Sequence, residues 1–106
     1  MVGGLEQMVL LAILHLEDGA YAVTIRRELE KRSGKRVSRG AVYTVLERLE
    51  SKGYLLSHVG SPTPERGGRG KRFYRVTPAG LKALKTSKDA MVKLWRGLES
   101  VLGKIS

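Results

Sequence analysis

The last third of the chain carries an apolar repeat that the rest of the chain is too short to cover. Thr77 and Pro78 predict the start of a helix, because threonine is a good N-cap and proline suits the first helical position. Beyond them, with Lys88 filling one gap, apolar residues recur in a heptad-like seam at positions 81, 84, 91, 95, 98, 102 and 105. A helix of about 25 residues is roughly 37 Å long. The preceding 76 residues cannot cover it, so its far half is expected to need a partner chain.

The N-terminal segment leads to the same expectation. Residues 5–18 place apolar side chains at helical spacing, and Val9, Leu10 and Leu11 make that helix apolar nearly all round. Such a helix is buried on more than one side, which a small monomer rarely arranges. The chain has 106 residues, of which 42% are hydrophobic, so we expect one domain with a modest core.

Two more helices are predicted between these segments, over residues 20–34 and 37–53. Gly34 ends the first as a C-cap, Ser38 is a good N-cap for the second, and Gly53 stops it. The expected core stripes are Ala22, Ile25 and Leu29 in the first helix, and Val42, Leu46 and Leu49 in the second. The side chains on the opposite faces are mostly polar or basic.

A β-hairpin is predicted after the third helix. Residues 54–60 and 71–77 are short runs rich in β-branched and aromatic residues, and they flank a loop of prolines, glycines and arginines. Alternation in the second strand puts Tyr74 and Val76 on one face, with Phe73 and Arg75 on the other. The loop is therefore a charged hairpin tip.

Basic charge is concentrated in two places. The net charge is +10, with seven basic and two acidic residues over 26–39, and five basic and one acidic over 60–77. Two separate basic clusters in a small domain favour a polyanionic partner such as nucleic acid. The alternatives are an anionic membrane surface or a basic surface that only serves solubility.

The order helix, helix, helix, strand, basic loop, strand is that of a winged helix-turn-helix. We therefore predict a mainly α fold with a small β-hairpin wing (α+β). Residues 1–77 would form the DNA-binding domain and residues 78–106 the C-terminal dimerisation helix. A helix fits the major groove of DNA and reads base edges there, while a Gly/Arg hairpin tip follows the backbone or enters the minor groove.

The candidate DNA-binding residues follow from this geometry. On the polar face of the third helix we expect groove contacts from Ser38, Arg39, Tyr43, Thr44 and Arg48. Backbone contacts are expected from Lys35 and Arg36 before that helix, and wing contacts from Arg66, Arg69, Lys71 and Arg72. The alternative for each set is an ordinary solvated surface.

Three segments resemble the PadR family of bacterial transcriptional regulators, and most of all its subgroup with a short C-terminal helix. They are "LEQMVLLAIL", "VSRGAVYTVLERLESKGYL" and "GGRGKRFYRVTPAGLKAL". The resemblance implies a winged-helix homodimer that binds operator DNA, usually as a repressor, with its last helix against the partner's last and first helices. It also implies that Tyr43 matches the family's tyrosine, which reaches phosphate. Where the family often has Tyr-Gly, this chain has Tyr21-Ala22, and we expect the second helix to start cleanly there.

The dimer seam includes Trp95, for which a core role is expected. Since some PadR-family members bind planar hydrophobic or phenolic compounds near the dimer interface, a second hypothesis is an aromatic effector beside Trp95. The expected interface and effector residues are Trp95, Met91, Leu98, Met8 and Leu102.

Other functions are less well supported by the sequence. A winged-helix module that binds RNA or only organises nucleic acid remains the alternative. An enzyme is not expected, since no nucleophile, acid–base pair or metal cluster stands out, and no cofactor or metal is expected either. His15 and His58 have no carboxylate near them at ligand spacing. No membrane span is expected, and the absence of cysteine and of a signal segment favours the cytoplasm.

Overall fold

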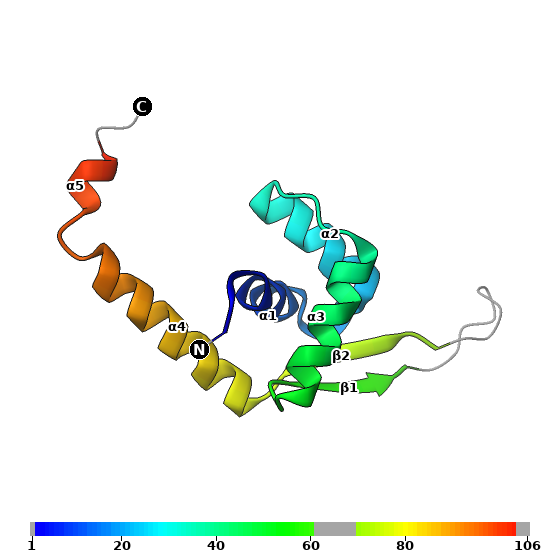
Figure 1. The fold of residues 1–106 in the computed structure, drawn as a ribbon. Helices are drawn as coiled ribbons and strands as arrows, with labels where there is room; N and C mark the ends of the chain where they lie inside the picture. The colour runs from blue at the N-terminus through cyan, green and yellow to red at the C-terminus, as the bar shows by residue number, and fades with distance from the viewer. Residues whose placement is uncertain (1, 61–69, 104–106) are drawn as a thin grey trace.

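The structure, a computed structural model, is a winged helix with its last helix leading away from the body of the domain (Figure 1). It describes residues 2–60 and 70–103. None of the helices in those ranges is long and apolar enough to cross a membrane. The elements, in chain order, are α1 (Gly4–Leu16), η1 (Glu17–Gly19), α2 (Ala22–Ser33), α3 (Arg39–Ser51), β1 (Leu55–Val59), β2 (Arg72–Val76), α4 (Pro78–Trp95) and α5 (Glu99–Leu102). The predicted fold class is confirmed.

The core lies where α1, α2 and α3 pack together against the hairpin. The stripe predicted for α3 is buried, and so are Ile25 and Leu29 of α2, whereas Ala22 is only half-buried. In α1, Val9 and Leu10 are fully buried, but Leu11 and Leu14 are exposed. The first helix therefore uses part of its apolar surface in the core and leaves part uncovered.

The hairpin is an antiparallel two-stranded sheet that also contacts the segment before α2. Leu55 pairs with Val76 at one end, and Val59 pairs with Arg72 at the other. Tyr21 forms an isolated bridge with Phe73. On the face toward the helices, Leu55 and Tyr74 are buried, as strand alternation requires. The wing is thus attached to the start of α2 as well as to α3.

The junction between α3, the hairpin and α4 is held by hydrogen bonds of Thr77. The Thr77 hydroxyl accepts a hydrogen bond from the Gly80 N–H at 3.1 Å and donates to the Gly53 carbonyl at 2.7 Å. The Thr77 N–H donates to the Tyr54 carbonyl at 3.0 Å. Gly53 itself has φ of 78°, which glycine adopts without strain. The predicted Thr77 cap is confirmed, and the same side chain fixes where α4 leaves the domain.

The C-terminal helix is shorter than predicted. α4 ends at Trp95, Gly97 has φ of 87°, and only the short α5 follows. The expectation of one continuous helix to position 105 is therefore wrong at Arg96 and Gly97, and Ile105 lies outside the described residues. Glycine weakens a helix by about 1 kcal/mol relative to alanine. Among the described residues, no element buries this region to offset that cost, since positions 91–103 are all exposed.

Candidate nucleic-acid interface

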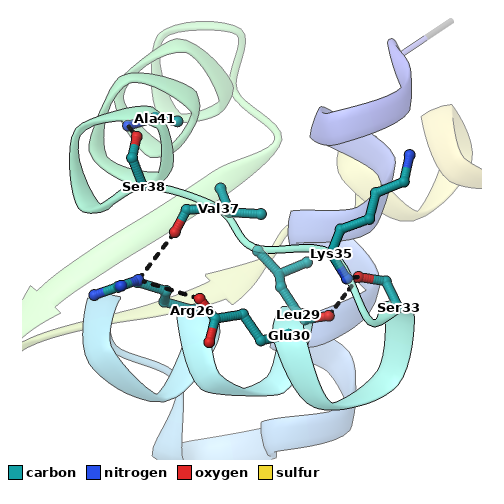
Figure 2. A network of polar contacts seen from close by, with 8 residues as sticks. All are labelled: Arg26, Leu29, Glu30, Ser33, Lys35, Val37, Ser38 and Ala41. Carbon is teal, nitrogen blue, oxygen red and sulfur yellow. Dashed lines mark hydrogen bonds and ion pairs between the residues drawn. The ribbon is translucent and has the colours of Figure 1, made fainter.

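The turn between α2 and α3 is held by a side chain from α2. The Arg26 Nε donates a hydrogen bond to the Val37 carbonyl at 2.9 Å and lies 3.6 Å from a Glu30 carboxylate oxygen (Figure 2). Residues 34–38 have no regular structure of their own. The guanidinium therefore fixes the end of this turn, which is also the point where α3 begins.

Two serines complete the turn at its two ends. The Ser33 hydroxyl donates to the Leu29 carbonyl at 2.6 Å and accepts from the Lys35 N–H at 3.2 Å, while Gly34 takes a left-handed φ of 73°. The Ser38 hydroxyl accepts from the Ala41 N–H at 3.1 Å and caps α3 (Figure 2). The predicted Gly34 C-cap of α2 and the predicted Ser38 N-cap of α3 are both confirmed. Other free N–H groups in the first turn of α3 are left to face an anion such as a phosphate.

The outward face of α3 carries most of the residues predicted to enter a groove. Arg39, Tyr43 and Thr44 are all exposed, and the Tyr43 side chain is 48% accessible. The Thr44 hydroxyl donates back to the Gly40 carbonyl at 2.9 Å. Arg39, Tyr43 and Glu47 follow one another at four-residue steps, so they form a stripe along the helix.

Arg48 lies apart from this stripe. Five residues after Tyr43, it is rotated from it by about 140° around the helix. It follows Thr44 at a four-residue step, and its charge contributes in a minor way to lowering the pKa of the Glu6 carboxyl. Arg48 therefore lies with Thr44, at the flank of the stripe that Arg39, Tyr43 and Glu47 form.

Glu6 ties the start of α1 to the end of α3 near this flank. Its carboxylate accepts from the Lys52 ammonium at 2.9 Å and from the Gly3 N–H at 3.2 Å. The hydrogen bond from Lys52 is the main cause that lowers the pKa of Glu6, against a smaller opposing effect of burial. This pair links α1 to the C-terminal end of the helix that carries the candidate site.

Arg26 and Arg27 were not among the residues predicted from the sequence to bind DNA. They line a cleft between α2 and α3 together with Arg39 and Tyr43. The sequence shows only that they avoid the apolar stripe of α2. Their approach to Arg39 depends on how α2 and α3 cross, which local periodicity does not report.

The basic residues at the root of the wing are held by other side chains. The Lys71 ammonium lies 4.3 Å from the centre of the Tyr21 ring and donates to its hydroxyl at 3.2 Å. The Arg72 Nη1 donates to the Ser57 hydroxyl at 3.0 Å, which in turn donates to a Glu50 carboxylate at 2.6 Å. These contacts attach the wing root to α2 and α3. Lys71 and Arg72 thus have positioning contacts that the sequence did not predict.

The other residues predicted to bind DNA lie on the turn before α3 or in the wing loop. Lys35 and Arg36 are exposed on the turn before α3, beside the first turn of that helix. Arg66 and Arg69 lie outside the described residues. Residues 2–60 and 70–103 contain no group of three or more side chains that could hold a metal ion.

A separate apolar groove runs between α1 and α4. It has a volume of about 510 Å³, and it is lined on the α1 side by Leu11 and Leu14 and on the α4 side by Met91 and Trp95, among others. Met8 lies elsewhere, in a small pocket between α1 and α2 beside His15 and Leu29. The structure of one chain therefore brings Met91 to Trp95 but does not bring Met8 to them. Leu98 and Leu102 are exposed beyond the end of α4.

Comparison with known proteins identifies the family. A sequence model of the transcriptional regulator PadR-like family matches residues 10–86, which include α2, α3 and the whole hairpin. The chain belongs to the PadR-like family of transcriptional regulators. It is 39% identical over 92 residues to the transcriptional regulator Rv3488 of Mycobacterium tuberculosis, covering 83% of this chain and 79% of that protein.

Solved structures agree on the PadR fold. A PadR-like transcriptional regulator from Bacillus cereus superposes with a TM-score of 0.73 at 22% identity, covering 92% of this chain and 90% of that one. A PadR family transcriptional regulator from Eggerthella lenta gives a TM-score of 0.70 at 26% identity, covering 92% and 83% respectively. The family resemblance in the sequence is therefore confirmed, and with it the winged-helix architecture.

Proposed function

We propose that this PadR-family regulator binds operator DNA sequence-specifically, with α3 in the major groove and the wing on the backbone. The observation that carries the proposal is the anchored start of α3. Arg26 and Ser38 fix this end of the helix, and the exposed Arg39 and Tyr43 extend from it. A rigid, basic helix start with free N–H groups suits a phosphate and the base edges beside it.

The roles of the remaining residues follow from where they lie. Arg39, Tyr43 and Thr44 face the groove, and Lys35 and Arg36 contact phosphates on its near side. Lys71 and Arg72, with Arg66 and Arg69 of the loop, contact the backbone on the wing side. Arg48, one four-residue step after Thr44, contacts DNA further along the same side of α3. Each phosphate contact steepens the salt dependence of binding by about 0.9 in the log–log slope.

We further propose that the protein is a homodimer formed through residues 78–106 and α1. The apolar side chains exposed on α4 and α5 are large, and Leu94 is 71% accessible. On α4, Leu81, Met91 and Trp95 line the apolar groove together with Leu11 and Leu14 of α1, so the uncovered apolar sides of the two helices adjoin. A surface of this extent on a small chain favours a protein interface, and a second copy supplies a matching one.

Control by a small molecule completes the proposal. Binding to the operator represses transcription, and a planar aromatic effector beside Trp95 and Met91 releases it. The groove supplies an aromatic face and aliphatic walls for such a ligand. Titration of aromatic compounds against Trp95 fluorescence tests this part, and an unchanged signal across a broad panel would contradict it.

Selection from a random duplex pool tests the central proposal. We expect recovery of a palindromic site that binds about 10³-fold more tightly than a scrambled duplex. Arg39→Ala should weaken that binding, whereas Arg75→Ala, an equal loss of charge on the strand face away from Tyr74, should change it little. Sedimentation should give about 23 kDa, twice the chain mass of 11.7 kDa. Equal affinity for both duplexes would favour an architectural or RNA-binding role.

A further inference from the structure

Glu47 differs from every other acidic residue on the α-helices of the described chain. Over residues 2–60 and 70–103, it alone among them has neither an ion pair nor a hydrogen-bond donor for its carboxylate. The others are bound to a lysine, an arginine, a serine hydroxyl or a backbone N–H, namely Glu6, Glu28, Glu30, Glu50, Asp89 and Glu99.

Glu47 also gains nothing from its own helix. The residues three and four positions away are Tyr43, Thr44, Glu50 and Ser51, and none of them is basic. A like charge at Glu50 is slightly unfavourable at this spacing. The position is in the middle of α3, beyond the first turn where the helix dipole favours an acid. The stability of the fold therefore gives no reason for a carboxylate at position 47.

The carboxylate lies on the face that the proposed function turns toward DNA. It is exposed, and it lies about 6 Å further along the helix than Tyr43. It borders the cleft between α3 and the wing, together with Tyr43, Lys71 and Arg72. A negative charge here is repelled by phosphates, so it lowers affinity for DNA in general.

A hydrogen-bond donor on a base edge in the major groove compensates this repulsion; cytosine N4 and adenine N6 are the two amino groups that donate there. The exocyclic N4 amino group of cytosine donates a hydrogen bond there, and carboxylates are its usual acceptors. We propose that Glu47 is a specificity-determining residue that accepts this hydrogen bond and selects a C·G pair at one position of each half-site. The inference rests on the proposed function. It adds that the same side chain weakens binding to DNA that lacks the amino group at that position.

The test measures base preference and affinity separately. The operator selected by the wild-type protein is varied to all four base pairs at each position, and each duplex is titrated with wild type, Glu47→Gln and Glu47→Ala. We expect wild type to prefer C·G at one position by about 10-fold or more. Glu47→Ala should lose that preference and bind the other three duplexes more tightly. Glu47→Gln should move it toward A·T, since an amide pairs with adenine.

Asp18→Asn provides the matched control. It removes one negative charge from an exposed residue that lies beside Phe73 and Arg75, on the other side of the hairpin. It should leave every base preference unchanged. Thermal melting confirms that each variant is folded, which is expected for an exposed site.

Three results separate the outcomes. If wild type selects no sequence at all, the proposed function fails and the role of Glu47 falls with it. If wild type selects an operator and Glu47→Gln keeps every base preference, the role of Glu47 alone is refuted. A uniform loss of affinity for all four duplexes in Glu47→Gln also refutes it, because that result indicates a structural partner for the carboxylate.

Discussion

Gly80→Ala tests how closely α4 is held to the rest of the domain. A Cβ built at Gly80 lies 2.5 Å from the Tyr54 carbonyl oxygen and 2.8 Å from a Val76 methyl group. Ordinary contacts of this kind begin near 3.4 Å. The Tyr54 carbonyl already accepts from the Thr77 N–H at 3.0 Å, so neither side of the junction is free to move away.

The expected cost follows from these distances. Overpacking of this kind lowers the free energy of unfolding by about 1–3 kcal/mol. The higher helix propensity of alanine offsets less than about 1 kcal/mol of this loss. We therefore expect a net loss of about 1–2 kcal/mol. With about 2.1 cal/mol/K of unfolding entropy per residue over 106 residues, this lowers the Tm by about 5–9 °C.

Thermal unfolding followed by circular dichroism at one fixed protein concentration measures the effect. Gly40→Ala is the matched control, because Gly40 also lies in the first turn of a helix and a Cβ there meets no atom within 4 Å. It should leave the Tm unchanged or raise it. A Gly80→Ala protein that melts no lower than Gly40→Ala would refute the proposed steric basis of the junction.

Three other predictions concern the interface and the dimer. Arg26→Ala removes the hydrogen bond to the Val37 carbonyl, so we expect about 1 kcal/mol less stability and weaker operator binding with sedimentation unchanged; unaltered binding would contradict the anchoring role. Because Lys52 lowers the pKa of Glu6 below its ordinary 4.5, this pair stabilises the fold above about pH 4.5 and less as the pH falls through the lowered value; the stability difference between wild type and Glu6→Gln in urea titrations should therefore shrink on acidification. Leu98→Glu should shift sedimentation toward the monomer with little loss of helix content, since Leu98 belongs to the predicted seam and is exposed in the single chain.

The wing shows what can and cannot be predicted about DNA contacts from the positions of basic residues in the sequence. A basic residue near a Gly-rich loop indicates DNA contact, and the sequence offers no way to rank Lys71 or Arg72 against the arginines of the loop. The structure adds that Lys71 is bound to Tyr21 and Arg72 to Ser57. Because the hydrogen-bonded residues are 50 and 15 positions apart in sequence, respectively, these contacts are seen only in the folded chain.

The sequence by itself determined the elements, their order and their core faces. Helical periodicity, the Ser38 and Thr77 caps and strand alternation at Tyr74 are local properties, so they survive in any context that allows the element to form. The tertiary structure decided what depends on neighbours distant in sequence. It placed Arg26 on the turn before α3, and it bound Lys71 to Tyr21 and Arg72 to Ser57. The reason is that partners distant in sequence are set by packing between elements, and this packing is not encoded in the residue spacing within any one element.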